Sequence, residues 1–165
     1  MAIETERKFL LASDAWRREA VTPPKRLVQG YFPRVAGGPT VRVRISGAKG
    51  FLTVKGRPRD DAPVSRSEFE YVIPAEEAES MLEEFCSDRI VKKLRYIFPA
   101  DDGLRWEIDE YLELNVGLFT AEIELPEPDT PFPRPPWLGE EISGDPRYTN
   151  GALSCRPYSL WRNGK

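Results

Sequence analysis

Pairs of charged residues, two positions apart, recur along this chain inside segments that otherwise resemble β-strands. Because successive side chains of a strand point to opposite faces, both charges of a pair lie on one face and their apolar neighbours lie on the other. The pairs are Glu4/Glu6 followed by Lys8, Arg42/Arg44, Glu68/Glu70, Lys93/Arg95, Glu107/Asp109 and Glu122/Glu124. The pattern predicts a sheet with one apolar face and one face that carries both acids and bases.

Eight segments have this strand-like character and are spaced for antiparallel pairing. They are residues 3–11, 26–32, 40–46, 50–55, 66–73, 90–98, 104–112 and 119–125. An ordinary sandwich core would bury their charged faces, and unpaired buried charges are very costly. A closed barrel avoids this cost, because charges can line a wet interior while apolar residues pack against helices outside. We therefore predict an α+β fold, an eight-stranded antiparallel closed β-barrel (tunnel) with a charged lumen and a few flanking helices.

The remaining segments are expected to flank this barrel. Residues 13–19 begin with a good N-cap and indicate a short helix. After Pro74, apolar residues recur at helical spacing, at Ala78, Met81, Leu82 and Phe85. The proline-rich stretch 126–136 is expected to be irregular. Residues 137–154 are expected to form two short helical pieces against one end of the barrel.

Length and charge place further bounds on the protein. With 165 residues and no internal boundary, the chain predicts a single domain over 1–165, in which 155–165 is a tail. A formal net charge of −3 gives no electrostatic case for a nucleic acid or membrane partner. No apolar run is long enough to span a bilayer, and the N-terminus lacks the pattern of a signal peptide. We expect a cytoplasmic protein, either a monomer or a homodimer.

The chain contains no histidine, which excludes whole classes of chemistry. Serine–histidine and cysteine–histidine nucleophiles and histidine-bearing zinc sites are all ruled out. Cys86 and Cys155 are far apart in sequence and form no metal-binding spacing. Cys86 lies in an apolar helical pattern and is expected to be a buried free thiol. Any reaction must therefore use carboxylates, lysine, arginine, tyrosine or a hard metal ion.

The acidic pairs suggest a metal site. Carboxylate oxygens suit Mg²⁺ or Mn²⁺, which bind a few carboxylates together with water and substrate phosphate. The candidate ligands are Glu4, Glu6, Glu122 and Glu124, with Asp109 as a further ligand or as a carboxylate behind them. Taken alone, Glu4 and Glu6 fit a solvated edge strand better than a metal site, because exposed charge is common on edge strands. The recurrence of acidic pairs along the chain favours the metal site.

The basic residues are the counterpart of these acids. Arginine forks match phosphate oxygens, and lysine adds a compact charge. The candidates for phosphate binding are Lys8, Arg42, Arg44, Lys55, Lys93 and Arg95. The alternative, cross-strand ion pairs with Glu68 and Glu70, stays open. Tyr31 shares a strand face with Gln29, so it is either a hydrogen-bonding group of the interior or a half-buried structural tyrosine.

Taken in order, these residues resemble the CYTH superfamily, the triphosphate tunnel metalloenzymes. The stretch Glu4-x-Glu6-x-Lys8 is similar to the E-x-E-x-K signature of that family. The following motifs are similar as well: Gln29-Gly30-Tyr31, Val41-Arg42-Val43-Arg44, Thr53-Val54-Lys55, Arg66-x-Glu68-x-Glu70, Lys93-x-Arg95-Tyr96, Glu107-x-Asp109 and Glu122-x-Glu124. The resemblance covers residues 1–154 and is greatest to the compact bacterial triphosphatase-like branch. Thr149 and Gly151 flank Asn150 where some relatives place lysine.

The resemblance implies metal-dependent hydrolysis of inorganic triphosphate (tripolyphosphate), or of a related triphosphate, inside an eight-stranded tunnel. Lys8 and Tyr31 are then the catalytic candidates, with Lys8 orienting the attacking water. The family also contains class IV adenylate cyclases and thiamine triphosphatases. A cyclase would need an adenine pocket, which the sequence does not reveal. A non-catalytic polyphosphate- or nucleotide-binding module is a further alternative, but it would need the bases more than the acids.

Overall fold

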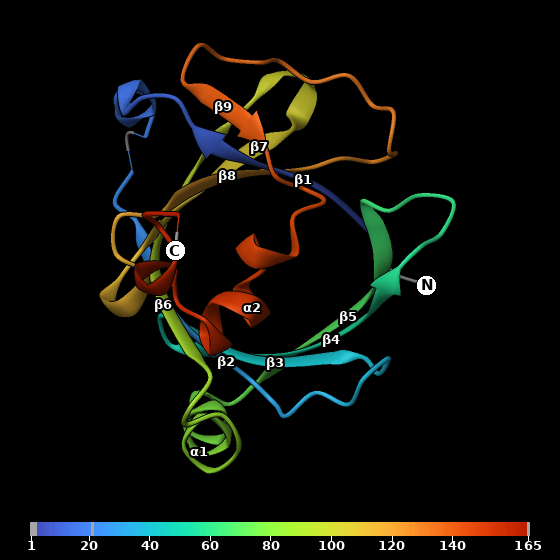
Figure 1. Ribbon diagram of the computed structural model, residues 1–165, viewed down its shortest axis with the longest axis vertical. Helices are drawn as coiled ribbons and strands as arrows, with labels where there is room; N and C mark the ends of the chain where they lie inside the picture. The colour runs from blue at the N-terminus through green and yellow to red at the C-terminus, as the bar shows by residue number, and fades with distance from the viewer. Residues whose placement is uncertain (1–2, 21, 165) are drawn as a thin grey trace.

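The computed structural model describes residues 3–20 and 22–164, and in it eight antiparallel strands close into a barrel (Figure 1). The strands are β1 Ile3–Leu11, β2 Lys25–Tyr31, β3 Thr40–Ser46, β4 Lys49–Pro58, β5 Ser65–Ile73, β6 Ile90–Pro99, β7 Arg105–Tyr111 and β8 Phe119–Glu124. Their order around the wall is β5-β4-β3-β2-β6-β7-β8-β1, and β1 pairs with β5 to complete the ring. The predicted closed barrel and all of its eight strands are confirmed.

The ring closes over a short stretch of β1. Residues Ile3, Glu4 and Thr5 pair with β5, whereas the following part of β1 pairs with β8. The hydroxyls of Thr5 and Ser65 share a hydrogen bond of 2.6 Å at this junction, where both side chains are buried. Closure removes the exposed edges that β1 and β5 would otherwise present.

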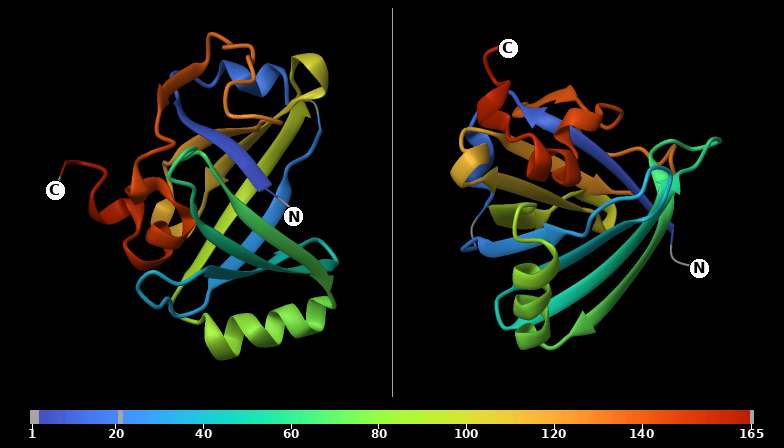
Figure 2. Two further views of the ribbon diagram at one scale, coloured as in Figure 1. Left: turned by 90° about the vertical axis from the view of Figure 1, so that its right-hand side faces the viewer. Right: turned by 60° about the horizontal axis from the view of Figure 1, so that its bottom comes forward.

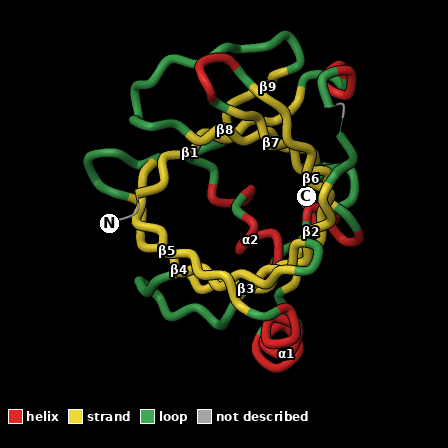
Figure 3. The backbone as a smooth tube through the Cα atoms, turned by 180° about the vertical axis from the view of Figure 1, so that it is seen from behind, coloured by secondary structure: helices red, strands yellow, loops and turns green. Residues whose placement is uncertain are grey.

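The ladder registers place the charged pairs on the interior face. Side chains of directly opposite residues project from the same side of a sheet. Lys8 lies opposite Glu122, and Arg95 lies opposite Asp109. The same rule places the interior face on the other strands, which form a closed ring when viewed along the barrel axis (Figure 3). The alternation in the sequence therefore describes the inside and the outside of the barrel.

Helix α1 (Ala75–Phe85) covers one part of the outer surface (Figure 2). It packs on β2, β3 and β4. A Cβ atom on Gly30 would lie 2.5 Å from Cβ of Cys86, and one on Gly50 would lie 2.7 Å from Cβ of Ala78. The two glycines thus allow the helix to approach the wall closely. Cys86 is buried and free, as predicted.

The opposite part of the outer surface is covered by irregular segments and one added strand. Its core consists of Phe9, Trp16, Phe98, Trp106, Ile108, Ala121, Ile123, Leu125 and Trp137. Trp16 comes from η1 (Ala15–Arg18), and Trp137 follows the irregular stretch 126–136. The expectation that helices cover the apolar face is therefore correct only for α1. On the outer side of β5, Phe69 and Tyr71 remain exposed.

One local prediction is correct in part and another is wrong. The short helix expected over 13–19 is present as the single 3₁₀ turn η1. Residues 138–141, expected within a helical piece, form strand β9 (Leu138–Glu141). After Thr5, β1 no longer pairs with β5, so one edge of the C-terminal half of β1 needs another partner. Strand β9 supplies that partner, with Phe9 opposite Glu141.

Short helical pieces close one end of the barrel, as predicted for this part of the chain. They are η4 (Pro146–Tyr148) and α2 (Asn150–Cys155), followed by η5 (Tyr158–Leu160). Viewed along the barrel axis, α2 appears inside the ring of strands (Figure 1). Leu153 is fully buried against Val91, Tyr111 and Leu118. The turn η2 (Asp101–Gly103) connects β6 to β7, and η3 (Glu113–Asn115) lies between β7 and β8. No helix in the described ranges is long and apolar enough to cross a membrane.

Candidate active site

All the predicted site residues occupy interior positions of the barrel wall. Strand β1 supplies Glu4, Glu6 and Lys8, and β8 supplies Glu122 and Glu124. Strand β7 supplies Asp109, and the basic residues and Tyr31 come from β2, β3, β4 and β6. The structure therefore brings together acids and bases that are far apart in the sequence.

The most buried group of charges, here called the β6–β8 network, consists of Lys8, Lys93, Arg95, Asp109 and Glu122. Asp109 accepts a 2.5 Å hydrogen bond from Lys93 Nζ and bonds of 2.7 and 2.8 Å from Arg95. Glu122 accepts a 3.1 Å hydrogen bond from Arg95 Nη2, and its other oxygen forms an ion pair with Lys8 Nζ at 3.0 Å. Burial raises the pKa of Asp109, but the charges of Arg95 and Lys93 outweigh this effect and the pKa is lowered. Both carboxylates are therefore held ionised.

The two lysines of this network have pKa values that are shifted in opposite directions. Burial lowers the pKa of Lys93 to about 8, although Asp109 opposes the shift. Burial also lowers the pKa of Lys8, but the neighbouring Tyr111 and Glu122 raise it more, so the net pKa lies above the usual lysine value. Lys8 Nζ also donates to the Tyr148 backbone oxygen at 3.0 Å. Lys8 is thus a firmly protonated and well-positioned donor.

A second group, here called the β3–β5 network, consists of Arg42, Arg44, Thr53 and Glu70. Both arginines approach the same Glu70 oxygen through Nη2, at 3.2 Å from Arg42 and 3.3 Å from Arg44. Thr53 is fully buried, donates to Glu70 at 2.9 Å and accepts from Arg42 at 3.0 Å. The two arginines predicted to bind phosphate are therefore held side by side by one carboxylate.

Glu4 and Lys55 lie where β1 meets β5. Lys55 Nζ donates to both oxygens of Glu4, at 2.9 and 2.8 Å, and contacts Glu68 at 3.0 Å. Arg66 donates to Glu4 at 3.2 Å. Burial raises the pKa of Glu4, but Lys55 outweighs it, and the pKa falls to about 2. The cross-strand ion pairs left open by the sequence are therefore present.

Glu6 and Glu124 have a different environment from the other acids. They lie opposite each other across β1 and β8, and neither has an ion pair or side-chain hydrogen bond within the described residues. Burial raises the pKa of Glu6 to about 8, and the charges of Glu122 and Glu4 reinforce the shift. The pKa of Glu124 is also raised, first by burial and then by Glu4. Two facing carboxylates without a cation are a pair that a divalent ion would stabilise.

The predicted metal ligands are not gathered into one cluster. Within residues 3–20 and 22–164, no group of three or more acidic or cysteine side chains is arranged to hold a metal ion. Glu4 is turned towards Lys55, and Glu122 is turned towards Lys8. The donor chemistry, which is carboxylate oxygen only, still fits a hard divalent cation at Glu6 and Glu124.

Several interior residues were missing from the predicted site. Strand alternation placed Glu107 on the face of Asp109, and the structure pairs it with Arg95, although it was not chosen as a site residue. Tyr111 lies on the same face and donates to Asn150 Oδ1 at 2.9 Å. Asn150 also accepts from Lys93 at 3.4 Å. No local pattern indicates that the chain at Asn150 returns to the barrel interior.

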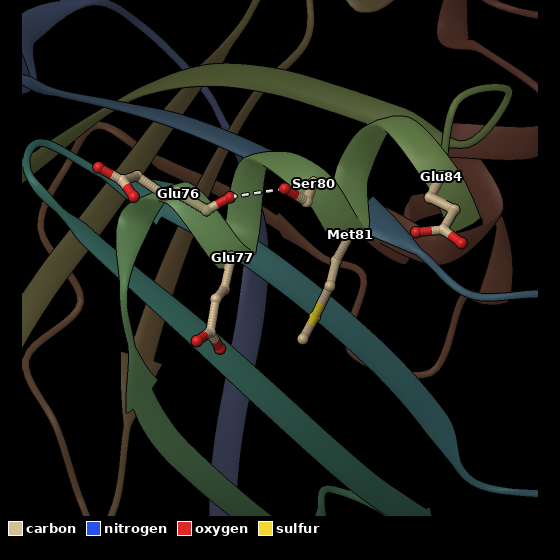
Figure 4. Close-up of a pocket in the computed structure, with 5 residues that line it drawn as sticks. All are labelled: Glu76, Glu77, Ser80, Met81 and Glu84. Atoms are coloured by element: carbon tan, nitrogen blue, oxygen red, sulfur yellow. Dashed lines mark hydrogen bonds between the residues drawn. The ribbon is translucent and has the colours of Figure 1, made fainter.

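A separate surface hollow lies on α1 and is not connected with these networks (Figure 4). It is lined by Glu76, Glu77, Ser80, Met81 and Glu84, all from this one helix. Its polar side chains include Ser80, whose hydroxyl donates to the Glu76 backbone oxygen at 2.9 Å. The convergent charges of the molecule are in the barrel interior and not in this hollow.

The fold and the interior charges are those of a protein that binds a compact anion within a closed barrel. The CYTH domain family model matches residues 2–149, and the chain belongs to this family. Membership of this family implies a divalent metal.

Relatives match the chain over almost its whole length. The inorganic triphosphatase of Acetivibrio thermocellus is 42% identical over 98% of this chain and 99% of its own length. The inorganic triphosphatase of Nitrosomonas europaea is 34% identical over 92% of this chain and 96% of its own. A crystal structure of an inorganic triphosphatase superposes with a TM-score of 0.63 at 31% identity, covering 94% of this chain and 96% of the other.

Proposed function

We propose that this chain is an inorganic triphosphatase, which hydrolyses tripolyphosphate inside its barrel with Mg²⁺ or Mn²⁺. The observation that carries this proposal is the interior, where arginines, lysines and carboxylates from seven different strands face one another. Tripolyphosphate is a small polyanion that binds divalent metals, so it needs both kinds of group at once. Relatives that cover nearly the whole chain carry the same activity in their names.

Phosphate binding is assigned to the interior bases, namely Arg42, Arg44, Lys55, Lys93 and Arg95. Each of them contacts a carboxylate oxygen of another strand, which keeps its charge directed into the barrel. Such preorganised cations stabilise negative charge without having to reorient when the substrate arrives. Asp109 is assigned the task of holding Lys93 and Arg95 in place, because both bases already occupy its oxygens.

Metal binding is assigned to Glu6 and Glu124, with Glu4 and Glu122 beside them. The facing pair has no ion pair of its own in the described chain, and burial, together with neighbouring carboxylates, raises the pKa of both side chains. When bound, a divalent ion supplies positive charge that stabilises the phosphate groups as the bond breaks. Mg²⁺ and Mn²⁺ are the ions that this oxygen donor set suits.

Lys8 is assigned the orientation of the attacking water. Its raised pKa means that it keeps its proton, so it acts as a hydrogen-bond donor and not as a general base. The Tyr148 backbone oxygen and Glu122 hold Nζ from two sides and so limit its freedom. Fixed geometry of this kind lowers the entropic barrier of the attack.

A substrate panel tests the proposal. Purified protein is incubated with tripolyphosphate, ATP or thiamine triphosphate, each with Mg²⁺ or Mn²⁺, and phosphate, pyrophosphate and cyclic AMP are quantified. We expect tripolyphosphate to give the highest kcat/KM and to yield phosphate and pyrophosphate, with activity lost in excess EDTA and in Glu6→Gln. If cyclic AMP were the main product from ATP, the protein would be a cyclase and not a hydrolase. Full activity in excess EDTA would show that the reaction needs no metal.

A further inference from the structure

Two rows of interior residues cross the wall from β2 to β5, and only one of them contains a carboxylate. Directly opposite residues on neighbouring strands form each row and share one face of the sheet. The first row is Tyr31, Arg42, Thr53 and Glu70, and the second is Gln29, Arg44, Phe51 and Val72. Arg42 therefore has its acid in its own row, whereas Arg44 reaches into the neighbouring row to meet Glu70 at 3.3 Å.

The surroundings of Arg44 are unfavourable to a cation. Both arginines share one oxygen of Glu70, and the Nε atom of each is buried without a partner in the described chain. Burial lowers the pKa of Arg44 and the charge of Arg42 lowers it further, although Glu70 opposes the shift. Because a guanidinium stays protonated in proteins, Arg44 is a cation held beside a like charge.

Phe51 gives Arg44 an interaction of a different kind. The guanidinium carbon of Arg44 lies over the Phe51 ring, 5.2 Å from its centroid. Among the described residues, Phe51 belongs to no core cluster and to no aromatic pair, so core packing does not explain its place in a charged interior. An aromatic face attracts a cation, and the attraction is stronger where water is excluded. The ring offers no acceptor oxygen, so it leaves the N–H groups that a carboxylate in its place would bind.

Resting on the proposed function, we infer that Phe51 is a positioning residue for Arg44: its ring holds the guanidinium beside Arg42 and leaves the N–H donors to the phosphate oxygens of tripolyphosphate. Phe51 acts through Arg44 and not on the substrate. When phosphate displaces Glu70 from the arginines, the ring stays in place, because it does not compete with an anion for the same donors. Arg44 thus keeps its position at the moment when its carboxylate partner is lost.

Phe51→Leu tests the contact, because it removes the ring and keeps an apolar side chain. We expect KM for tripolyphosphate to rise about fivefold, the scale of a partly desolvated cation–π contact, with a smaller change in kcat. Phe51→Tyr keeps the aromatic face and should recover most of the loss. Phe69→Leu is the matched control, because Phe69 lies on the outer side of β5 with 43% exposure and should not affect KM. A wild-type KM in Phe51→Leu, or an equal loss in Phe51→Tyr, would overturn the inference.

A double-mutant cycle with Arg44→Ala separates positioning from a purely structural role. Phe51→Leu should lower kcat/KM in the wild-type background and have little further effect in Arg44→Ala. Equal losses in both backgrounds would contradict the inference, because the ring would then act on the fold or on the substrate. A lower KM in Phe51→Leu would also contradict it, because the ring would then compete with phosphate for the guanidinium. Should Phe51→Leu fail to fold by circular dichroism, Phe51→Met, which also lacks a ring, replaces it.

Turnover by the wild-type protein distinguishes this inference from the proposed function. Wild-type protein that releases no phosphate from tripolyphosphate with Mg²⁺ or Mn²⁺ would refute the proposed function, and the inference would fall with it. Wild-type turnover together with an unchanged KM in Phe51→Leu would refute only the role of Phe51. We expect wild-type turnover, a raised KM in Phe51→Leu and an unchanged KM in Phe69→Leu.

Discussion

The two charge networks of the barrel interior contain similar groups but differ in how exposed their carboxylates are. In the β6–β8 network, the side chains of Lys93 and Asp109 are 1% and 0% exposed. In the β3–β5 network, those of Arg44 and Glu70 are 15% and 32% exposed. The helical pieces η4 and α2 explain part of the difference, because Tyr148 and Asn150 cap Lys8 and Lys93.

The comparison separates charges that maintain the structure from charges that are free to exchange partners. Water screens an exposed ion pair, so its carboxylate yields easily to a competing phosphate. A buried carboxylate is costly to leave unpaired and keeps its bases in one geometry. We therefore expect the β3–β5 network to govern how tightly phosphate binds and the β6–β8 network to govern folding and the geometry of the reaction.

The largest effect is expected from Asp109→Ala. It leaves Lys93 and Arg95 buried without their main counter-ion, and breaking a buried pair in this way costs about 3–5 kcal/mol. Urea unfolding followed by circular dichroism measures the loss in the free energy of unfolding. A loss below about 1 kcal/mol, which is typical of exposed pairs, would remove the distinction between the two networks.

Lys8→Ala and Arg42→Ala should differ in kinetics. Losing the positioned Lys8 should lower kcat about 10²-fold with a smaller change in KM. Lys8→Arg should not restore kcat, because the guanidinium differs in reach and shape. Arg42→Ala should mainly raise KM, because its contacts to phosphate exist in the ground state as well as in the transition state.

Steady-state assays on tripolyphosphate at saturating Mg²⁺ measure both effects, with circular dichroism as the folding control. A normal kcat with a raised KM in Lys8→Ala would make Lys8 one more phosphate ligand. The positioning of water would then fall to another group of the interior.

The raised pKa of Glu6 predicts an effect of pH on the metal-free protein. Because burial favours the neutral carboxyl, its contribution to stability is complete below the ordinary pKa of 4.5 and is lost as the pH rises through about 8. Glu6→Gln cannot ionise and should avoid this loss. Thermal unfolding is measured in EDTA between pH 5 and 9. The unfolding temperature of the variant should rise relative to that of wild type as the pH rises, and a pH-independent difference between the two would contradict the raised pKa.

The smallest effect is expected from Glu70→Gln in the β3–β5 network. Its side chain is partly solvated, so losing the pair with Arg42 and Arg44 should change the free energy of unfolding by about 1 kcal/mol or less. The same urea titration as for Asp109→Ala measures it. A loss as large as that of Asp109→Ala would show that exposure does not distinguish the networks.

The local sequence was sufficient for the strands and for the face that each residue occupies. Alternation with a period of two is a property of each strand alone, so Glu6, Arg44 and Asp109 could be assigned to one interior face before any pairing was known. The absence of histidine likewise restricted the chemistry in advance. The segment whose structure was misjudged, residues 138–141, lacks such a repeating pattern and depends on what it packs against.

The pairing of charges inside the barrel was decided by the tertiary structure. Whether Glu4 faces Lys55, or Glu6 is left opposite Glu124, depends on strand register and on where β1 leaves β5. The same is true of Asn150, which reaches Lys93 only because the C-terminal segment turns back into the barrel end. Electrostatic interactions act between neighbours in space, and burial sets their strength, so the ionisation of each carboxylate follows from the closed fold.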